Sequence, residues 1–304
     1  MAAEGLFSGG SPVLLDKETP FVQLLLPEAI DENESVGYEI QQNAMTSIAL
    51  EAARYGEKRV IVFGKPGTGA IGFVKTALLR LKRQSNVESR VLKLVCQRVW
   101  VEPEIEKILG AIEEKLNEAS SWTNDENHLM VLLIEKLDSL TSKINNYQKN
   151  KAIFGFWLYS ILKQSYNRTL IVCTSDDPSA IDDRLLRLFK LPLYLEHLNL
   201  QSIKRIFKTK MPRKDSEQVA ETLYRAVDKD GFKLVSAEVV KAIDRATTLA
   251  DFGTVSTNEA ARIIRGFIRP CYPSEVIKAY EECNKDLINY SKSFILRYWA
   301  KDTG

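Results

Sequence analysis

The sequence predicts an α/β fold, in which helices cover a parallel β-sheet, followed by an all-helical domain. Before Leu198, short apolar runs alternate with segments of helical periodicity, an order that favours a parallel sheet. The runs Leu129–Ile134 and Leu170–Cys173 are apolar throughout, which is typical of strands buried on both faces. From Leu198 onward the strand-like runs stop and only helical patterns remain.

The first domain is predicted at residues 21–197, after a loose leader at 1–20 that mixes Gly, Ser and Pro without a hydrophobic period. Apolar residues at helical spacing predict a helix over 38–55, which runs into the strand Arg59–Phe63. The remaining elements predicted in this domain are helices at 73–82, 104–119 and 149–164 and strands at 90–100, 129–134 and 169–174.

The second domain is predicted at residues 198–304. Several of its helices start at Ser or Thr, whose side chains accept hydrogen bonds from free N–H groups at a helix start. The predicted helices of this domain span 201–208, 216–229, 236–250, 257–268 and 274–298.

Composition excludes several classes of function. The 304 residues are 45% hydrophobic and 27% charged, which is ordinary for a globular protein. The apolar runs are shorter than the roughly 18 residues of a membrane helix, and the first residues lack a signal-peptide pattern, so we expect an intracellular protein. A net charge of +2 is too balanced to predict nucleic-acid binding from bulk electrostatics, so any such binding would have to be local. Two His and four Cys without ligand spacing predict no metal centre.

A Gly-rich turn, Gly64–Ile71, follows the first strand and precedes a helix, as in phosphate-binding loops. In such a loop, backbone N–H groups face the phosphates, a Lys reaches the β and γ phosphates, and a hydroxyl holds Mg²⁺. Ala70 and Ile71 stand at these two working positions. The turn is therefore kept while the side chains that do the chemistry are missing.

The glycines of this turn, Gly64, Gly67 and Gly69, have two interpretations. They form a tight strand-to-helix turn only, or they still approach a ligand; the first interpretation is favoured. Lys65 lies early in the turn, and we expect a solvated side chain rather than a substitute for the missing Lys.

A second motif follows the predicted strand at 129–134. Strands of this kind normally end in Asp-Glu, in which the Asp helps to hold Mg²⁺ and the Glu activates water. Here Glu135 at the first position remains able to approach a cation. Lys136 at the second position is protonated at neutral pH and cannot act as a general base.

Together these features resemble the AAA+ ATPase family, and within it the branch that contains the largest subunit of the origin recognition complex. The likeness covers nearly all of the chain after the leader, and it implies a P-loop-type αβα sandwich with a parallel sheet followed by an all-helical lid. The segments that carry it are Gly64–Gly69, Leu132–Asp138, Tyr147–Trp157, Leu170–Ser175, Leu185–Arg187 and Ser256–Arg262.

The resemblance also implies which catalytic parts are missing. Ser175 falls at the first sensor position, usually Asn, and Ala261 at the second, usually Arg, while Lys136 replaces the catalytic Glu. Arg187 matches the arginine finger, which acts on a neighbour's nucleotide; a surface salt bridge or a partner contact is the preferred interpretation. Each charge-assisted hydrogen bond to phosphate contributes about 1.5–3 kcal/mol, so these losses weaken nucleotide binding strongly. We therefore predict no ATPase activity, no nucleotide or other cofactor, and no metal.

This pattern of losses resembles a catalytically dead branch of the family that acts in yeast heterochromatin silencing. It implies a nuclear, non-catalytic module that binds nucleosomes or histones and another silencing-complex subunit, with at most weak DNA contact. The alternative is a subunit of an origin-recognition-like complex that holds nucleotide structurally or lends Arg187 to an active neighbour.

Two segments are candidates for partner contacts. The polar loop Thr141–Lys151, with Asn145 and Tyr147, is a candidate partner site or a plain connector. The densest basic stretch suits DNA phosphate or an acidic histone surface, and a solvated helix end explains it equally well. Its residues are Lys204, Arg205, Lys208, Lys210, Arg213 and Lys214.

Overall fold

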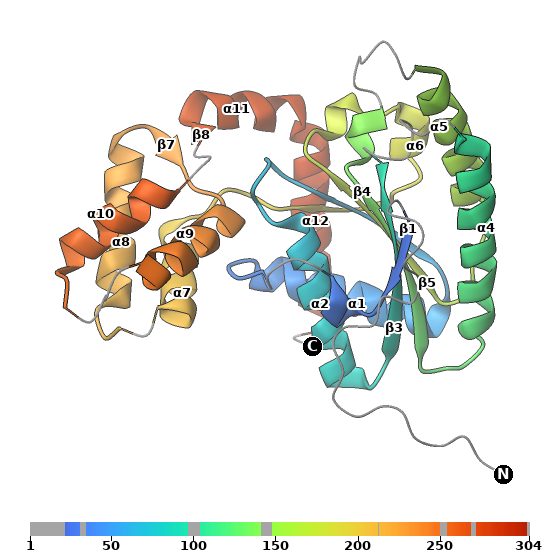
Figure 1. The fold of residues 1–304 in the computed structure, drawn as a ribbon, viewed down its shortest axis with the longest axis horizontal. Coiled ribbons are helices and arrows are strands. Elements are labelled where there is room, and N and C mark those ends of the chain that lie inside the picture. Colours follow the sequence, from blue (N-terminus) through green and yellow to red (C-terminus); the bar gives the residue numbers. More distant parts are fainter. Residues whose placement is uncertain are drawn as a thin grey trace.

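The fold is that of a computed structural model, which describes residues 22–30, 35–96, 104–140, 148–211, 213–249, 254–268 and 272–302. Two units stand out, a base domain built on a sheet and a helical lid beside it (Figure 1). Within the described residues, no helix is both long and apolar enough to cross a bilayer. The predicted fold class, a mostly parallel α/β sheet followed by a helical region, is confirmed.

In its described part, the base domain contains a six-stranded sheet in the order β1-β3-β4-β5-β2-β6. Strand β1 runs antiparallel to β3, and the other neighbours are parallel. The edge strands β1 and β6 are absent from the sequence prediction. Strand β3 ends at Val95, and residues 97–100 of the strand predicted at 90–100 lie outside the described residues. The strands are β1 (Val22–Leu25), β2 (Lys58–Phe63), β3 (Glu88–Val95), β4 (His128–Glu135), β5 (Thr169–Ser175) and β6 (Leu191–Tyr194).

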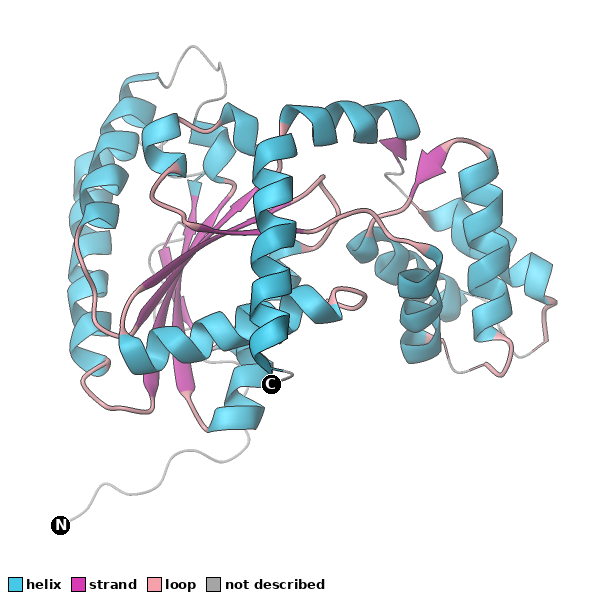
Figure 2. Ribbon diagram, turned by 180° about the vertical axis from the view of Figure 1, so that it is seen from behind, coloured by secondary structure: helices cyan, strands magenta, loops and turns pink. Residues whose placement is uncertain are grey.

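Helices cover both faces of this sheet (Figure 2). Along β4, Met130, Leu132 and Ile134 lie in the core shared with α4 and α5. The alternate residues Leu129 and Val131 lie in the core shared with α1, α2 and α12 (Lys285–Asp302). Burial on both faces explains why this strand is apolar throughout. The base helices are α1 (Glu39–Tyr55), α2 (Ala70–Ser85), α4 (Ile105–Trp122), α5 (Gln148–Lys163) and α6 (Asp183–Leu186), with 3₁₀ turns at Pro27–Ala29, Leu137–Leu140 and Pro178–Ala180.

The lid helices pack around a core of their own. Helices α7 and α10 begin after Asn199 and Ser256, whose side chains accept a backbone N–H of the first turn. A two-residue ribbon, β7 (Phe232–Lys233) with β8 (Tyr272–Pro273), interrupts the predicted all-helical pattern. The helices of this core are α7 (Leu200–Lys210), α8 (Ser216–Lys229), α9 (Ser236–Leu249) and α10 (Thr257–Phe267).

The end of the chain returns from the lid to the base domain. The single helix predicted at 274–298 is two helices, α11 (Ser274–Cys283) and α12 (Lys285–Asp302), which meet at Asn284. Figure 1 shows α11 crossing from the lid to the base, where α12 runs along the domain.

Helix α12 belongs to the base domain by its contacts. Phe294 and Ile295 lie in the base core, and Ser291 Oγ accepts the N–H of Tyr194 at 2.9 Å. The segment predicted as the lid therefore ends in a helix that packs on the base.

Gly64, which follows β2, is required by a close approach of the backbone. A Cβ at this position would lie 2.5 Å from the carbonyl oxygen of Leu195, whereas a Cβ at Gly110 in α4 meets nothing within 4 Å. We expect Gly64→Ala to lower the free energy of unfolding by about 1–3 kcal/mol through overpacking. The matched change Gly110→Ala should raise it by about 0.5–1 kcal/mol, because Ala favours a helix interior over Gly. Urea unfolding of the two variants measures both, and equal effects would contradict the close approach.

Candidate functional site

The Gly-rich turn keeps the backbone shape of a phosphate loop. It connects β2 to α2, and its glycines Gly67 and Gly69 have φ of 90° and 82°, which other residues adopt with strain. Ala70 begins α2, and both Ala70 and Ile71 pack against the base core. The two positions that carry phosphate and Mg²⁺ chemistry in a working loop therefore contribute to packing.

The lid lies directly on this loop. The N–H of Ala237, in the first turn of α9, donates to the carbonyl of Gly67 at 3.0 Å. A Cβ at Gly67 would lie 3.0 Å from side-chain carbons of Val235 and Glu238, so the lid closely approaches the loop. Glu238 also brings a carboxylate beside the loop, and its side chain is only 15% exposed. Lid and loop are thus joined by protein contacts, and the carboxylate of Glu238 lies beside them.

Lys65, predicted to be solvated, is half-buried and also lies beside two aromatic rings. Its ammonium lies 4.5 Å from the ring centroid of Tyr280 and 6.0 Å from that of Tyr272. The Tyr272 hydroxyl donates to the carbonyl of Pro66 at 2.9 Å, across a separation of 206 residues in the chain. The segment that carries both rings therefore folds back over the loop, and the positive charge of Lys65 faces aromatic rings.

Burial and nearby carboxylates keep the Tyr280 phenol neutral. Its side chain is buried, and burial, followed by the negative charges of Asp177, Asp176 and Asp138, raises its pKa well above the usual range. A neutral ring keeps the negative face that attracts an ammonium group. The ring facing Lys65 therefore keeps the same charge state throughout the physiological pH range.

The acidic motif after β4 is neutralised by its neighbours. Glu135 is buried, and its Oε1 lies 2.7 Å from Nζ of Lys93 on the adjacent strand β3. Lys136, at the catalytic-base position, has a left-handed φ of 53°, and its Nζ lies 3.2 Å from Asp176 Oδ2. Each of these two motif charges therefore has a partner of opposite sign within the protein.

The first sensor position takes part in the same network. Ser175 is buried and its Oγ accepts the N–H of Asp177 at 3.1 Å. Asp138 accepts the N–H of Asp176 at 3.1 Å, and burial raises the pKa of Asp138 while the hydrogen bond from Ser175 opposes that effect. The N–H of Gly64 donates to the Ser175 carbonyl at 3.3 Å, which ties this network to the loop.

The remaining two site positions lie apart from the loop contacts. Ala261, at the second sensor position, is buried inside the lid core beside Ala260 and Ile264. Arg187 is exposed at the end of α6 and forms no ion pair with any described residue, so the predicted salt bridge is not present there. Among those residues, no group of three or more His, Cys, Asp or Glu gathers to hold a metal.

Several residues that shape the site escaped the sequence analysis. They belong to no motif, and only Lys93 carried a signal, as a cation between apolar neighbours in a strand. The others approach the loop from elements distant in sequence. These residues are Lys93, Asp176, Ala237, Glu238, Tyr272 and Tyr280.

The first half of the basic stretch is paired with acids. Lys204 and Lys208 lie 2.9 and 3.7 Å from carboxylates of α8, and Arg205 lies 3.0 Å from Glu39. Of these three, Lys204 is half-buried, while Lys208 and Arg205 are exposed. This part of α7 is thus a helix face on which most charges have a partner.

The second half of the stretch is more varied. Arg213 is 2.7 Å from Asp215 and also donates to the carbonyl of Val255. Lys214 is exposed, while Lys210 lines a cleft between the domains. The six basic residues therefore do not form one continuous free surface. The other predicted contact residues, Asn145 and Tyr147, lie outside the described residues.

Comparison with known proteins agrees with this architecture. Residues 60–196 match the model of the AAA family, described as ATPase family associated with various cellular activities. This part of the chain, a little under half of it, is therefore similar to AAA ATPase family domains. No curated protein matches the chain.

Solved structures share the fold at low identity. The AAA domain of FIGL-1 is 18% identical, with a TM-score of 0.61 over 89% of this chain and 93% of that one. A chain of the E. coli MS115-1 HORMA:CdnC:Trip13 complex is 14% identical, with a TM-score of 0.61 over 78% and 91%. PCH-2 of C. elegans is 13% identical, with a TM-score of 0.58 over 84% and 77%. At these identities the likeness shows the fold alone.

The Lys65 contact predicts a stability effect. We expect Lys65→Met, which keeps an apolar stem and removes the charge, to lower the free energy of unfolding by about 0.5–2 kcal/mol. Lys190→Met is the matched control, because Lys190 is exposed. Chemical denaturation measures both, and an unchanged K65M protein would mean that the ammonium contributes nothing to the closed site.

Proposed function

We propose that this chain is a non-catalytic AAA domain. In it, contacts between the base domain and the lid take the place of a nucleotide site, and the outer surface binds partners. The observation that carries the proposal is the contact of the α9 N-terminus with the Gly-rich loop, made by the hydrogen bond from Ala237 to Gly67. A joint of this kind holds the lid in one position without nucleotide.

The residues present do not fit a bound nucleotide with Mg²⁺. Glu135, at the motif position that approaches a cation, is paired with Lys93. Lys136, at the position of the catalytic base, is paired with Asp176. Glu238 places a carboxylate beside the loop, and its Oε1 lies 3.6 Å from Nζ of Lys241. These contacts support a site that neither holds nucleotide nor activates water.

The finer part of the proposal rests on resemblance. In this chain the family's catalytic residues are replaced at Ala70, Ile71, Lys136 and Ala261. This pattern of replacements resembles that of the AAA-like domain of the yeast heterochromatin protein silent information regulator three. On that resemblance we propose a nuclear module of a silencing complex that binds nucleosomes or histones and a partner subunit. The contacts between base and lid support this proposal, because two domains held together present one binding surface to a partner.

Nucleotide binding tests the non-catalytic proposal. We expect calorimetry with ATP and Mg²⁺ to detect no micromolar binding by the wild-type chain. The variant Ala70→Lys with Ile71→Thr should also fail to bind at that level, because the lid contact and the Lys93–Glu135 pair remain. The AAA domain of FIGL-1, whose structure has been solved with ADP, is the positive control. Micromolar affinity of the wild-type chain would overturn the proposal.

Charge reversal tests the nucleosome contact. We expect Lys208→Glu with Lys214→Glu to weaken binding to reconstituted nucleosomes by about tenfold, since attraction becomes repulsion. Both side chains are exposed, and the pair that Lys208 forms with Glu217 at 3.7 Å is exposed as well. Reversal of Arg213, by contrast, would break its half-buried contacts with Asp215 and Val255 and harm the lid itself.

The matched control for this experiment is Lys190→Glu with Lys278→Glu, which changes the net charge equally at exposed positions elsewhere. A mobility-shift titration at fixed salt compares the proteins. Equal binding by wild type and both double variants would exclude the basic stretch as the contact surface.

A second function is favoured by Arg187 alone. Its exposed side chain, at the end of α6, stands at the motif position from which an arginine finger reaches a neighbour's nucleotide. In that case the chain would raise the ATPase rate of an active AAA partner. Arg187→Ala would then abolish the increase while leaving nucleosome binding intact, and an unchanged rate would exclude this role.

A further inference from the structure

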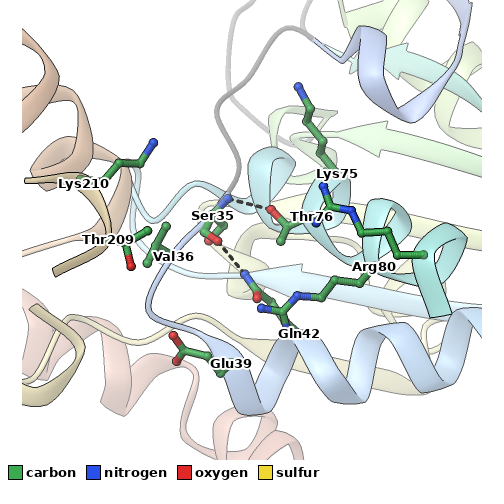
Figure 3. A pocket seen from close by; sticks show the side chains of 10 residues that line it. Ser35, Val36, Glu39, Gln42, Lys75, Thr76, Arg80, Thr209 and Lys210 are labelled. Carbon is green, nitrogen blue, oxygen red and sulfur yellow. Dashed lines mark hydrogen bonds between the residues drawn. The ribbon is translucent and has the colours of Figure 1, made fainter. Parts of the chain in front are cut away.

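A cleft of about 600 Å³ lies between the base domain and the lid, separate from the Gly-rich loop contacts. Helices α1 and α2 form its base side, and the end of α7 forms its lid side. In Figure 3, Lys210 and Thr209 lie on the lid side of Ser35, and Lys75 and Arg80 on the base side. This volume falls within the roughly 300–1,000 Å³ typical of ligand sites.

Positive charge is concentrated in this cleft. Its lining includes one acidic side chain, Glu39, which already lies 3.0 Å from Arg205. The basic side chains of the lining are Lys75, Arg80, Arg83 and Lys210. Lys75 Nζ donates to the carbonyl of Ile30 at 2.9 Å, whereas Arg80 and Lys210 line the cleft from its base and lid sides. A concave site in which basic side chains outnumber acidic ones attracts anionic ligands.

The polar groups in the cleft are fixed by hydrogen bonds. The N–H of Ser35 donates to Thr76 Oγ1 at 2.8 Å, and Gln42 Nε2 donates to the Ser35 carbonyl at 2.9 Å. Arg80 donates to Asn43 Oδ1 at 3.1 Å, which orients its guanidinium. A cleft whose walls are already ordered loses less conformational entropy when a ligand binds.

We propose that this cleft binds an acidic peptide segment of a protein partner, with Asp or Glu carboxylates paired to Arg80 on the base and Lys210 on the lid. Arg binds carboxylates through two parallel hydrogen bonds, and Lys adds a point charge. Glu39 and Thr209 line the same cleft and supply acceptors for the backbone N–H groups of a peptide. A DNA backbone has no N–H groups to donate to them. A DNA duplex presents its phosphates on a convex surface and does not enter a cleft of this kind, so the geometry favours the peptide.

This inference deepens the proposed function, because it names the chemistry of the partner. It rests on one part of that function, namely that the chain acts by binding. A peptide that contacts both α2 and α7 also adds contacts between base and lid. Peptide binding should therefore raise the melting temperature of the whole chain.

The test is a fluorescence-polarisation titration of the full chain with a labelled peptide of alternating Glu and Asp, at fixed salt. We expect the wild-type chain to bind it, and the same peptide made of Gln and Asn to bind far more weakly. Arg80→Glu and Lys210→Glu should each weaken binding by about tenfold or more, as expected for a charge-assisted hydrogen bond. The neutral variants R80Q and K210Q serve the same test if the reversed ones do not fold.

The control is the double variant Lys190→Glu with Lys278→Glu, which changes charge outside the cleft and should keep most of the affinity. Equal weakening by this control, or unchanged binding by the cleft variants, would overturn the proposal. Tighter cleft-dependent binding of duplex DNA than of the peptide would replace it with a nucleic-acid site. The nucleosome experiment above leaves Arg80 and Lys210 unchanged, so the two proposals fail independently.

Discussion

The contact between the N-terminus of α9 and the Gly-rich loop is the constraint on which the rest of the site depends. The hydrogen bond from Ala237 to Gly67 joins the lid to the base. It requires a loop with glycines at positive φ, since a Cβ at Gly67 or Gly69 would press against the lid at 3.0–3.2 Å. The glycines that suit a phosphate loop are thus needed here for a different reason, the close approach of two protein surfaces.

Charges at the motif positions follow the same principle. A charge removed from water is costly unless it has a partner, so each of these charges is compensated from a neighbouring element. Glu135 is matched by Lys93 on β3, and Lys136 by Asp176 after β5. Each of these two charges thus has its partner on a neighbouring element of the base domain.

The return of the chain from lid to base makes this arrangement stable. Helix α11 crosses between the domains, and α12 packs into the base core through Phe294 and Ile295. Tyr272 and Tyr280 reach the loop only because this segment folds back over it. The basic cleft lies at the same junction of domains.

Local patterns were enough to predict the α/β class and the strands β2, β4 and β5, because periodicity is a local property of the chain. The short edge strands β1 and β6, the division at Asn284 and the docking of α12 depend on tertiary packing. The same holds for the pairing of Glu135 with Lys93 and for the aromatic cover over Lys65. Motif spacing identifies the positions of Glu135 and Lys136. Their ion-pair partners, Lys93 and Asp176, lie on or beside other strands, which only folding brings next to them.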